Sequence, residues 1–272
     1  MGFNTFSGGA AAPTNPNILP EIAGLGANGQ GTTITAHASA HTLGTAVQMV
    51  ASTSAAWSGF TLALSTASSG GIRYLVYVST DNASANLIVP PLFAQPNTTG
   101  VQNFEIPLQV AAGTSLYVAI RASTGGATLQ AEIIGWDPDG TGNAPGYTTA
   151  DALTTAATGT TQASSTDITV ATDASTFSSV SASLGQSYGA FLVCFGASTN
   201  PTNAGHHTVR LGKGAGNTVI GARAFGVTAG SPGTNRFSVL FNGPASSGEA
   251  LGLNIQGPTG GNVFQACVIG FR

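Results

Sequence analysis

The fold is decided by a stretch of sequence that occurs twice. Residues 112–136 read AGTSLYVAIRASTGGATLQAEIIGW, and residues 247–271 read SGEALGLNIQGPTGGNVFQACVIGF. The two segments align without a gap at an offset of 135 residues, and 10 of the 25 positions are identical. Their shared core is T-G-G-x-x-x-Q-A-x-[IV]-I-G-[WF]. Self-similarity of this kind indicates a tandem duplication and predicts two domains with the same fold.

Each copy of the repeat contains a turn that leads into a closing β-strand. The glycines of the Thr-Gly-Gly turn are Gly125, Gly126, Gly260 and Gly261. Because glycine adopts positive φ without strain, the pattern predicts a hairpin turn at these positions. The glycine one residue before the end of each closing strand, Gly135 or Gly270, predicts a close approach of the backbone to a neighbouring group.

The rest of the chain consists of short apolar or alternating segments, separated by Gly, Ser, Thr, Asn and Pro. This spacing is typical of antiparallel β-sandwiches. We therefore predict an all-β protein with two tandem, jelly-roll-like β-sandwich domains over residues 31–136 and 151–272, joined by a linker over 137–150. The expected strands lie at 32–36, 60–64, 73–78, 104–110, 116–121, 129–136, 167–171, 191–195, 208–211, 217–222, 237–241, 251–256 and 263–271.

Residues 1–30 are rich in Gly, Pro and Asn and show neither a helical nor a strand period. Such a segment is predicted to form an extended arm rather than part of a packed core. Ordering it costs about 1–2 kcal/mol per residue in backbone entropy, so we expect a partner to hold it. Its isolated hydrophobic residues, the expected assembly contacts, are Phe3, Phe6, Ile18, Leu19, Ile22 and Leu25.

The chain is poor in charge. Only 6% of its 272 residues are charged, against about 25% in typical proteins. Long coiled coils require interleaved charges and are excluded. The net charge is -3 and the seven Lys and Arg residues are dispersed, so we expect no direct contact with nucleic acid. The apolar runs are strand-sized, which excludes membrane insertion by a helix.

No Lys or Arg precedes Arg73, so a signal peptide is not expected and the sequence predicts synthesis in the cytoplasm. In a reducing compartment the two cysteines, Cys194 and Cys267, are expected to be buried free thiols. A disulfide between them remains open at this point.

One segment matches the nucleophile motif of serine hydrolases. Residues 185–189 read G-Q-S-Y-G, but the motif requires a helix after the serine, followed by an acid and then a histidine. Here a strand is expected next, and the single acid after Ser187 is Glu249, which follows both His206 and His207. We therefore expect no catalytic residues, no cofactor and no enzyme.

The expected linker contains a partial calcium loop. Asp137, Asp139 and Asn143 place oxygen ligands around two glycines, as calcium loops do. The acidic residue that would complete the loop is replaced by Thr148. The alternative is a metal-free turn, and this is the interpretation that the sequence favours.

The absence of a signal sequence, the polar arm and the charge-poor tandem sandwiches together resemble structural proteins of tailed-bacteriophage virions. These are head decoration or spike proteins, neck proteins, and tail or fibre components. The resemblance implies a location in the virion and partners among other virion proteins and copies of the chain itself. It transfers no functional residues. The alternative is an adhesin that binds a host-surface saccharide, with Tyr147 in the linker as the most exposed aromatic candidate.

Overall fold

The described part of the chain is built from β-strands. The computed structural model describes residues 21–23, 31–66, 71–96, 100–136, 146–154, 166–197, 201–230 and 236–272. Within these ranges eighteen strands form four antiparallel sheets. The predicted fold class, an all-β protein with tandem sandwiches, is confirmed. In the same ranges, no helix is long and apolar enough to cross a membrane.

Strands β1–β9 form the first pair of sheets, which we call roll 1. One sheet has the order β1-β9-β4-β7, with β2 also paired to β9, and the other has the order β3-β8-β5-β6. The strands are β1 (Glu21–Ala23), β2 (Thr32–Thr35), β3 (Val47–Val50), β4 (Gly59–Ser65), β5 (Tyr74–Ser79), β6 (Leu87–Ala94), β7 (Gln102–Ile106), β8 (Leu116–Ala122) and β9 (Thr128–Trp136).

Strands β10–β18 repeat this arrangement, and we call them roll 2. The sheet orders are β10-β18-β13-β16, with β11 also paired to β18, and β12-β17-β14-β15. Adding nine to each strand number of roll 1 gives roll 2. The strands are β10 (Ala150–Ala152), β11 (Thr166–Thr169), β12 (Ser178–Ser181), β13 (Tyr188–Ala197), β14 (Gly205–Lys213), β15 (Thr218–Val227), β16 (Arg236–Ala245), β17 (Leu251–Gln256) and β18 (Val263–Phe271).

The Thr-Gly-Gly turn is not a hairpin. It connects β8 to β9 in roll 1 and β17 to β18 in roll 2, and in each roll these two strands belong to different sheets. The jelly-roll order requires this, because the last strand must cross over and pair with the first and fourth strands of its roll. Gly126 and Gly261 have φ values of +69° and +101°. A Cβ on Gly125 would overlap the carbonyl oxygen of Ala38.

The last strand of each roll passes closely beneath an aromatic ring. A Cβ on Gly135 would overlap the indole of Trp57, and a Cβ on Gly270 would overlap the ring of Tyr188. Trp57 is 2% exposed and Tyr188 is 6% exposed. Each glycine therefore makes room for a buried aromatic side chain that packs against the last strand of its roll.

The sheet β1-β9-β4-β7 of roll 1 and its equivalent in roll 2, β10-β18-β13-β16, differ in burial; we call them the outer sheets. In β9, buried and half-buried positions alternate, as expected for a sheet with one face toward solvent. In β18, every residue after Val263 is buried. The outward positions of roll 1 include Thr61 and Glu132, whereas those of roll 2 include Leu192 and Cys267. Because the face of this roll 2 sheet that points away from the roll 2 core is also apolar, we infer that the sheet is covered on both faces.

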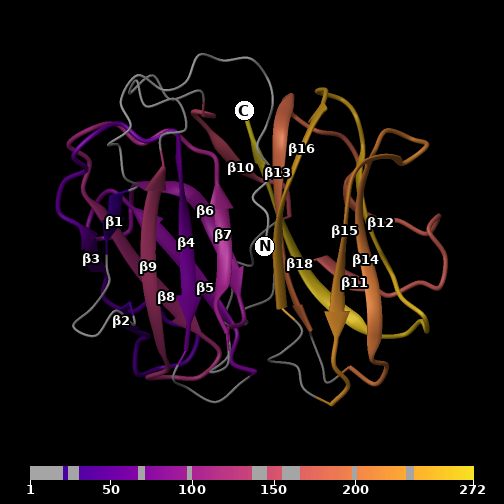
Figure 1. The fold of residues 1–272 in the computed structure, drawn as a ribbon, viewed down its shortest axis with the longest axis horizontal. Coiled ribbons are helices and arrows are strands. Elements are labelled where there is room, and N and C mark those ends of the chain that lie inside the picture. Colours follow the sequence, from indigo (N-terminus) through magenta and orange to yellow (C-terminus); the bar gives the residue numbers. More distant parts are fainter. Residues whose placement is uncertain are drawn as a thin grey trace, which may run out of the picture.

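Roll 1 covers that face. The outward residues of β13 and β18 belong to the same apolar cluster as the core of roll 1, and they are Ala190, Leu192, Cys194, Cys267, Ile269 and Phe271. Strand β6 contacts β10, β13 and β18, and β7 contacts β16. At the rim, the Arg73 guanidinium donates a hydrogen bond to the Gln265 amide oxygen at 2.9 Å. Figure 1 shows the two rolls side by side.

Several strands were absent from the sequence expectation. Strand β6 contains Pro90 and Pro91, which remove two backbone donors and argue against a central strand. Both prolines are tolerated because β6 is an edge strand of its sheet, where one side of the backbone needs no donors for pairing. Strands β3 and β12 have four residues each, too few for a clear alternation. Part of the expected arm, Glu21–Ala23, is strand β1 and pairs with β9 of the same chain.

The interface between the rolls predicts unequal effects for equivalent substitutions. Leu192→Ala removes a side chain that is 0% exposed between the rolls, so it should lower the free energy of unfolding by about 2–5 kcal/mol. Its counterpart in roll 1, Thr61→Ala, lies on the half-exposed face and should cost less than about 1 kcal/mol. Urea denaturation of both variants measures the difference, and equal losses would contradict the assignment of this interface.

Candidate functional site

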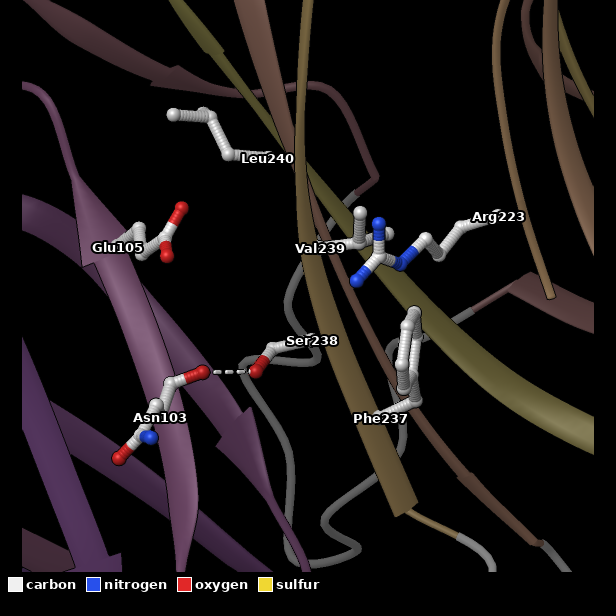
Figure 2. Close-up of a pocket in the computed structure, with 7 residues that line it drawn as sticks. All are labelled: Asn103, Glu105, Arg223, Phe237, Ser238, Val239 and Leu240. Atoms are coloured by element: carbon white, nitrogen blue, oxygen red, sulfur yellow. Dashed lines mark hydrogen bonds between the residues drawn. The ribbon is translucent and has the colours of Figure 1, made fainter. Parts of the chain in front are cut away.

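A pocket lies where the edges of three sheets converge. Strands β7, β16 and β15 are each the last strand of their sheet, and the pocket opens among them with a volume of about 290 Å³. It is therefore shared between the two rolls. Figure 2 shows its lining residues, which are Asn103, Glu105, Arg223, Phe237, Ser238, Val239 and Leu240.

The strand alternation explains which side chains reach the pocket from roll 1. In β7, Phe104 and Ile106 are buried in the core of roll 1, so Asn103 and Glu105 point outward. Both side chains lie between β7 and β16, on the side of β16 that faces roll 1 (Figure 2).

Roll 2 supplies the opposite wall. Phe237 and Val239 pack against the core of roll 2, whereas Ser238 and Leu240 lie on the alternate face of β16. Arg223, an exposed residue of β15, lies beside Phe237 and Val239 (Figure 2). The pocket thus surrounds the free edge of β16, with a carboxylate on one side and a guanidinium on the other.

Three contacts hold the walls in place. The Ser238 hydroxyl donates a hydrogen bond to the backbone carbonyl of Asn103, which joins β16 to β7 (Figure 2). The Phe237 ring stacks on Phe225 with the centroids 5.5 Å apart and an interplanar angle of 22°. It also packs against Phe195 at 5.4 Å. One face of Phe237 is therefore held by the core of roll 2.

The chemistry available in this pocket is non-covalent binding. It offers a carboxylate, a guanidinium, an amide, a hydroxyl and one half-buried aromatic ring. Across the residues that the structure describes, no group of three or more His, Cys, Asp or Glu side chains could hold a metal ion. The sequence did not single out this pocket, because β7 is far from the consecutive strands β15 and β16 in the chain, and the lining residues form no motif.

Most residues singled out in the sequence for assembly or calcium binding lie outside the described part of the chain. These are Phe3, Phe6, Ile18, Leu19 and Leu25 of the arm, and Asp137, Asp139 and Asn143 of the partial calcium loop. The remaining arm residue, Ile22, lies in β1 opposite Ile134 and is 48% exposed.

Tyr147 does not form an exposed platform for a sugar. Its ring is half-buried, lies 6.2 Å from the ring of Phe271 and approaches Gly189 closely. Its backbone amide donates to the Pro107 carbonyl at 2.9 Å, and Gln109 donates to its carbonyl at 2.8 Å. Tyr147 therefore packs in the contact between the rolls, which corrects the expectation from the sequence.

Ser187 lies immediately before strand β13 rather than at a strand-to-helix junction. Its hydroxyl oxygen accepts a hydrogen bond from the backbone amide of Ser247 at 3.0 Å, and the following segment is strand β13. The two adjacent histidines point to opposite sides of β14, since His206 is exposed and His207 is 1% exposed. The helix that the hydrolase motif requires is replaced here by a strand.

The two cysteines are free and face each other across β13 and β18. Cys194 and Cys267 are register partners, and both are buried between the rolls. Burial raises the pKa of both thiols. They are therefore held as neutral thiols, and they pack as small apolar groups.

His207 predicts a loss of stability on acidification. Burial lowers the pKa of its imidazole below the ordinary 6.5, and among the residues that the structure describes its Nε2 has no hydrogen-bond partner. Protonation below pH 6.5 therefore favours the unfolded chain, so this contribution to stability is complete above that pH and is lost as the pH falls toward the lowered pKa. In His207→Leu, the decrease in unfolding free energy over this window should be smaller than in the wild type.

Urea denaturation over a series of pH values measures this effect. The exposed neighbour provides the control, because His206→Gln should retain the acid-induced loss. A His207→Leu variant with the same pH dependence as the wild type would contradict the role of His207.

No protein-family model and no curated protein matches the chain. Among solved structures, PNGF-II aligns with a TM-score of 0.42 and 10% identity, covering 90% of this chain and 65% of that chain. A peptide-N(4)-(N-acetyl-β-D-glucosaminyl) asparagine amidase aligns at 0.36 and 10%, covering 88% and 96%. The VP2 subviral particle of infectious bursal disease virus aligns at 0.23 and 11%, covering 82% and 58%.

These likenesses concern the fold alone. The chain spans somewhat less than two thirds of the length of PNGF-II. The prediction that the chain is not an enzyme is contradicted, because an amidase stands among the structural neighbours. At this level of similarity no residue of a site is transferred to this chain.

Proposed function

We propose that the chain is a structural component of a virus particle, of the tailed-bacteriophage type, and that it contacts copies of itself and other virion proteins there. The observation that carries the proposal is the edge strand β15, which contacts β16 of its own roll but, among the described strands, has no strand paired with its outer edge. Its equivalent in roll 1, β6, is covered by β10, β13 and β18 of roll 2. β15 therefore has a different covering from that of β6, and we infer that its unpaired edge contacts a neighbouring subunit.

The properties of β15 suit such a contact. It has ten residues, most of them exposed, and no other strand of the described residues pairs with its outer edge. It contains no proline, unlike β6, and its single charged residue is Arg223. Long edge strands without proline or multiple charges offer main-chain groups to another polypeptide. A particle subunit, which must contact several neighbours, has a use for such an edge.

The composition supports the same proposal. Only 17 of 272 residues are charged, and both rolls share this poverty of charge. A surface of neutral polar and small side chains packs against neighbouring subunits without the desolvation cost of buried charges. Residues 1–20, the part of the predicted 1–30 arm that precedes β1, are the segment that we propose extends onto a neighbour.

The test is incorporation into particles. Epitope-tagged chain, expressed during infection by the virus that encodes it, should be recovered in gradient-purified particles. Ala222→Lys places a charge on the exposed side of β15 and should lower incorporation at least about tenfold, equivalent to about 1.4 kcal/mol.

Ser179→Lys is the matched control, since it places the same charge on β12, the edge strand at the other end of the same sheet. It should be incorporated like the wild type. Absence of the wild-type chain from particles would refute the proposed function. Normal incorporation of Ala222→Lys would show that β15 does not make the contact with a neighbouring subunit.

The arm is tested separately. Deleting residues 2–20 leaves strand β1 intact, so the truncated chain should fold with an unchanged circular dichroism spectrum and an unchanged midpoint of thermal unfolding. If the arm docks on neighbouring virion subunits, incorporation of the truncated chain should fall several-fold, since each ordered residue of an arm adds contacts at the assembly stage. Normal incorporation would show that the arm has no role in assembly.

A further inference from the structure

We propose that the pocket among β7, β15 and β16 binds a neutral saccharide. The proposal is independent of the proposed virion role, because it rests on the pocket and is tested on the isolated chain. The volume of about 290 Å³ is just below the range for small-molecule pockets, which begins near 300 Å³. A site of this size is suited to a single sugar ring rather than to an extended glycan.

The polar groups of the pocket match the hydroxyls of a sugar. The Glu105 carboxylate accepts hydrogen bonds on two oxygens, and the Arg223 guanidinium donates them from a planar fork. The Asn103 amide does both. Adjacent sugar hydroxyls present paired donors and acceptors at the spacing that such planar groups recognise. The Ser238 hydroxyl already donates to the Asn103 carbonyl, so it retains lone pairs that can accept.

The apolar part of the pocket is an aromatic ring whose position is fixed. Phe237 stacks on Phe225 on the side of the roll 2 core, and it is only half-buried where it borders the pocket. An aromatic ring held in this way offers its free surface to the C–H groups of a sugar ring. In Figure 2, Phe237 and Arg223 lie together on one side of β16, while Glu105 and Asn103 lie on the other.

The aromatic ring is specific to the second copy. Strand pairing places Phe237 opposite Phe195 in roll 2, and the corresponding pair in roll 1 is Gln102 opposite Leu64. Gln102 is 3% exposed and its amide oxygen accepts a hydrogen bond from the Gln95 backbone. Roll 1 therefore has a buried polar residue at the position where roll 2 has a half-exposed ring beside a cavity.

The charge of the pocket decides which saccharides it takes. Glu105 and Arg223 are its only charged lining residues, and their formal charges cancel. An acidic sugar would gain from Arg223 and lose from Glu105, whereas a neutral sugar uses both as hydrogen-bonding groups. We therefore assign the pocket to neutral hexoses or N-acetylhexosamines, and not to sialylated glycans.

The experiment is a glycan array with the purified full chain, comparing neutral glycans with their sialylated counterparts. The best neutral ligand, taken as its methyl glycoside, is then titrated and followed by NMR. We expect neutral glycans to bind, and Glu105→Gln and Arg223→Gln each to raise the dissociation constant about tenfold or more. Both side chains are exposed, so neither substitution should prevent folding.

Asp167→Asn is the matched control, because it converts an exposed carboxylate on β11, away from the pocket, into an amide. It should bind like the wild type. Three results would overturn the proposal: no binding of any neutral methyl glycoside at about 10 mM, ten times a dissociation constant of 1 mM; a preference for sialylated glycans; or unchanged binding in both pocket variants, which would place the site elsewhere.

Discussion

The structure depends on one apolar contact, in which the outer face of the sheet β10-β18-β13-β16 is buried against β6 and β7 of roll 1. On this face Leu192, Ile269 and Phe271 are shielded from water, and they belong to the core cluster of roll 1 rather than to that of roll 2. At about 25 cal/mol per Å² of apolar surface, burial of this kind is the main stabilising term available to a chain with so few charges. The two copies of the duplicated unit therefore pack against each other through a shared apolar cluster instead of forming two independent domains.

This contact also breaks the equivalence of the two copies. Roll 1 has a covered edge strand in β6 and an outer sheet whose exposed face alternates with buried positions. Roll 2 has the reverse, an outer sheet buried on both faces and an edge strand, β15, that contacts β16 of its own roll and pairs at its outer edge with no other described strand. The pocket arises at the boundary, because β16 ends its sheet where β7 of the other roll ends its own. Both functional proposals follow from this asymmetry: β15 is available to a neighbour, and the pocket requires both rolls.

Some of this could be anticipated from the residues. The 25-residue repeat indicated two copies of one β-rich unit, and the expected closing strands over 129–136 and 263–271 match β9 and β18 within one residue. The repeat also contains a difference between the copies that indicates which sheet is covered. Glu132 in the first copy is replaced by Cys267 in the second, and this change from a charged to an apolar outward residue marks the sheet that is covered. Strand β6 was missed because Pro90 and Pro91 are tolerated only at an edge, and the edge is a property of the sheet.

The sequence by itself determined the all-β class, the duplication and the positions of the glycines that lie beneath Trp57 and Tyr188, because these depend on local pattern and on residue size. Only the tertiary structure decided that the Thr-Gly-Gly turn crosses between sheets, that Tyr147 is packed between the rolls, and that Glu105, Arg223 and Phe237 line one pocket. The physical reason is the same in each case. Pairing between strands far apart in the chain, such as β2 with β9, follows from the burial of apolar surface over the whole molecule, which no local window of sequence contains.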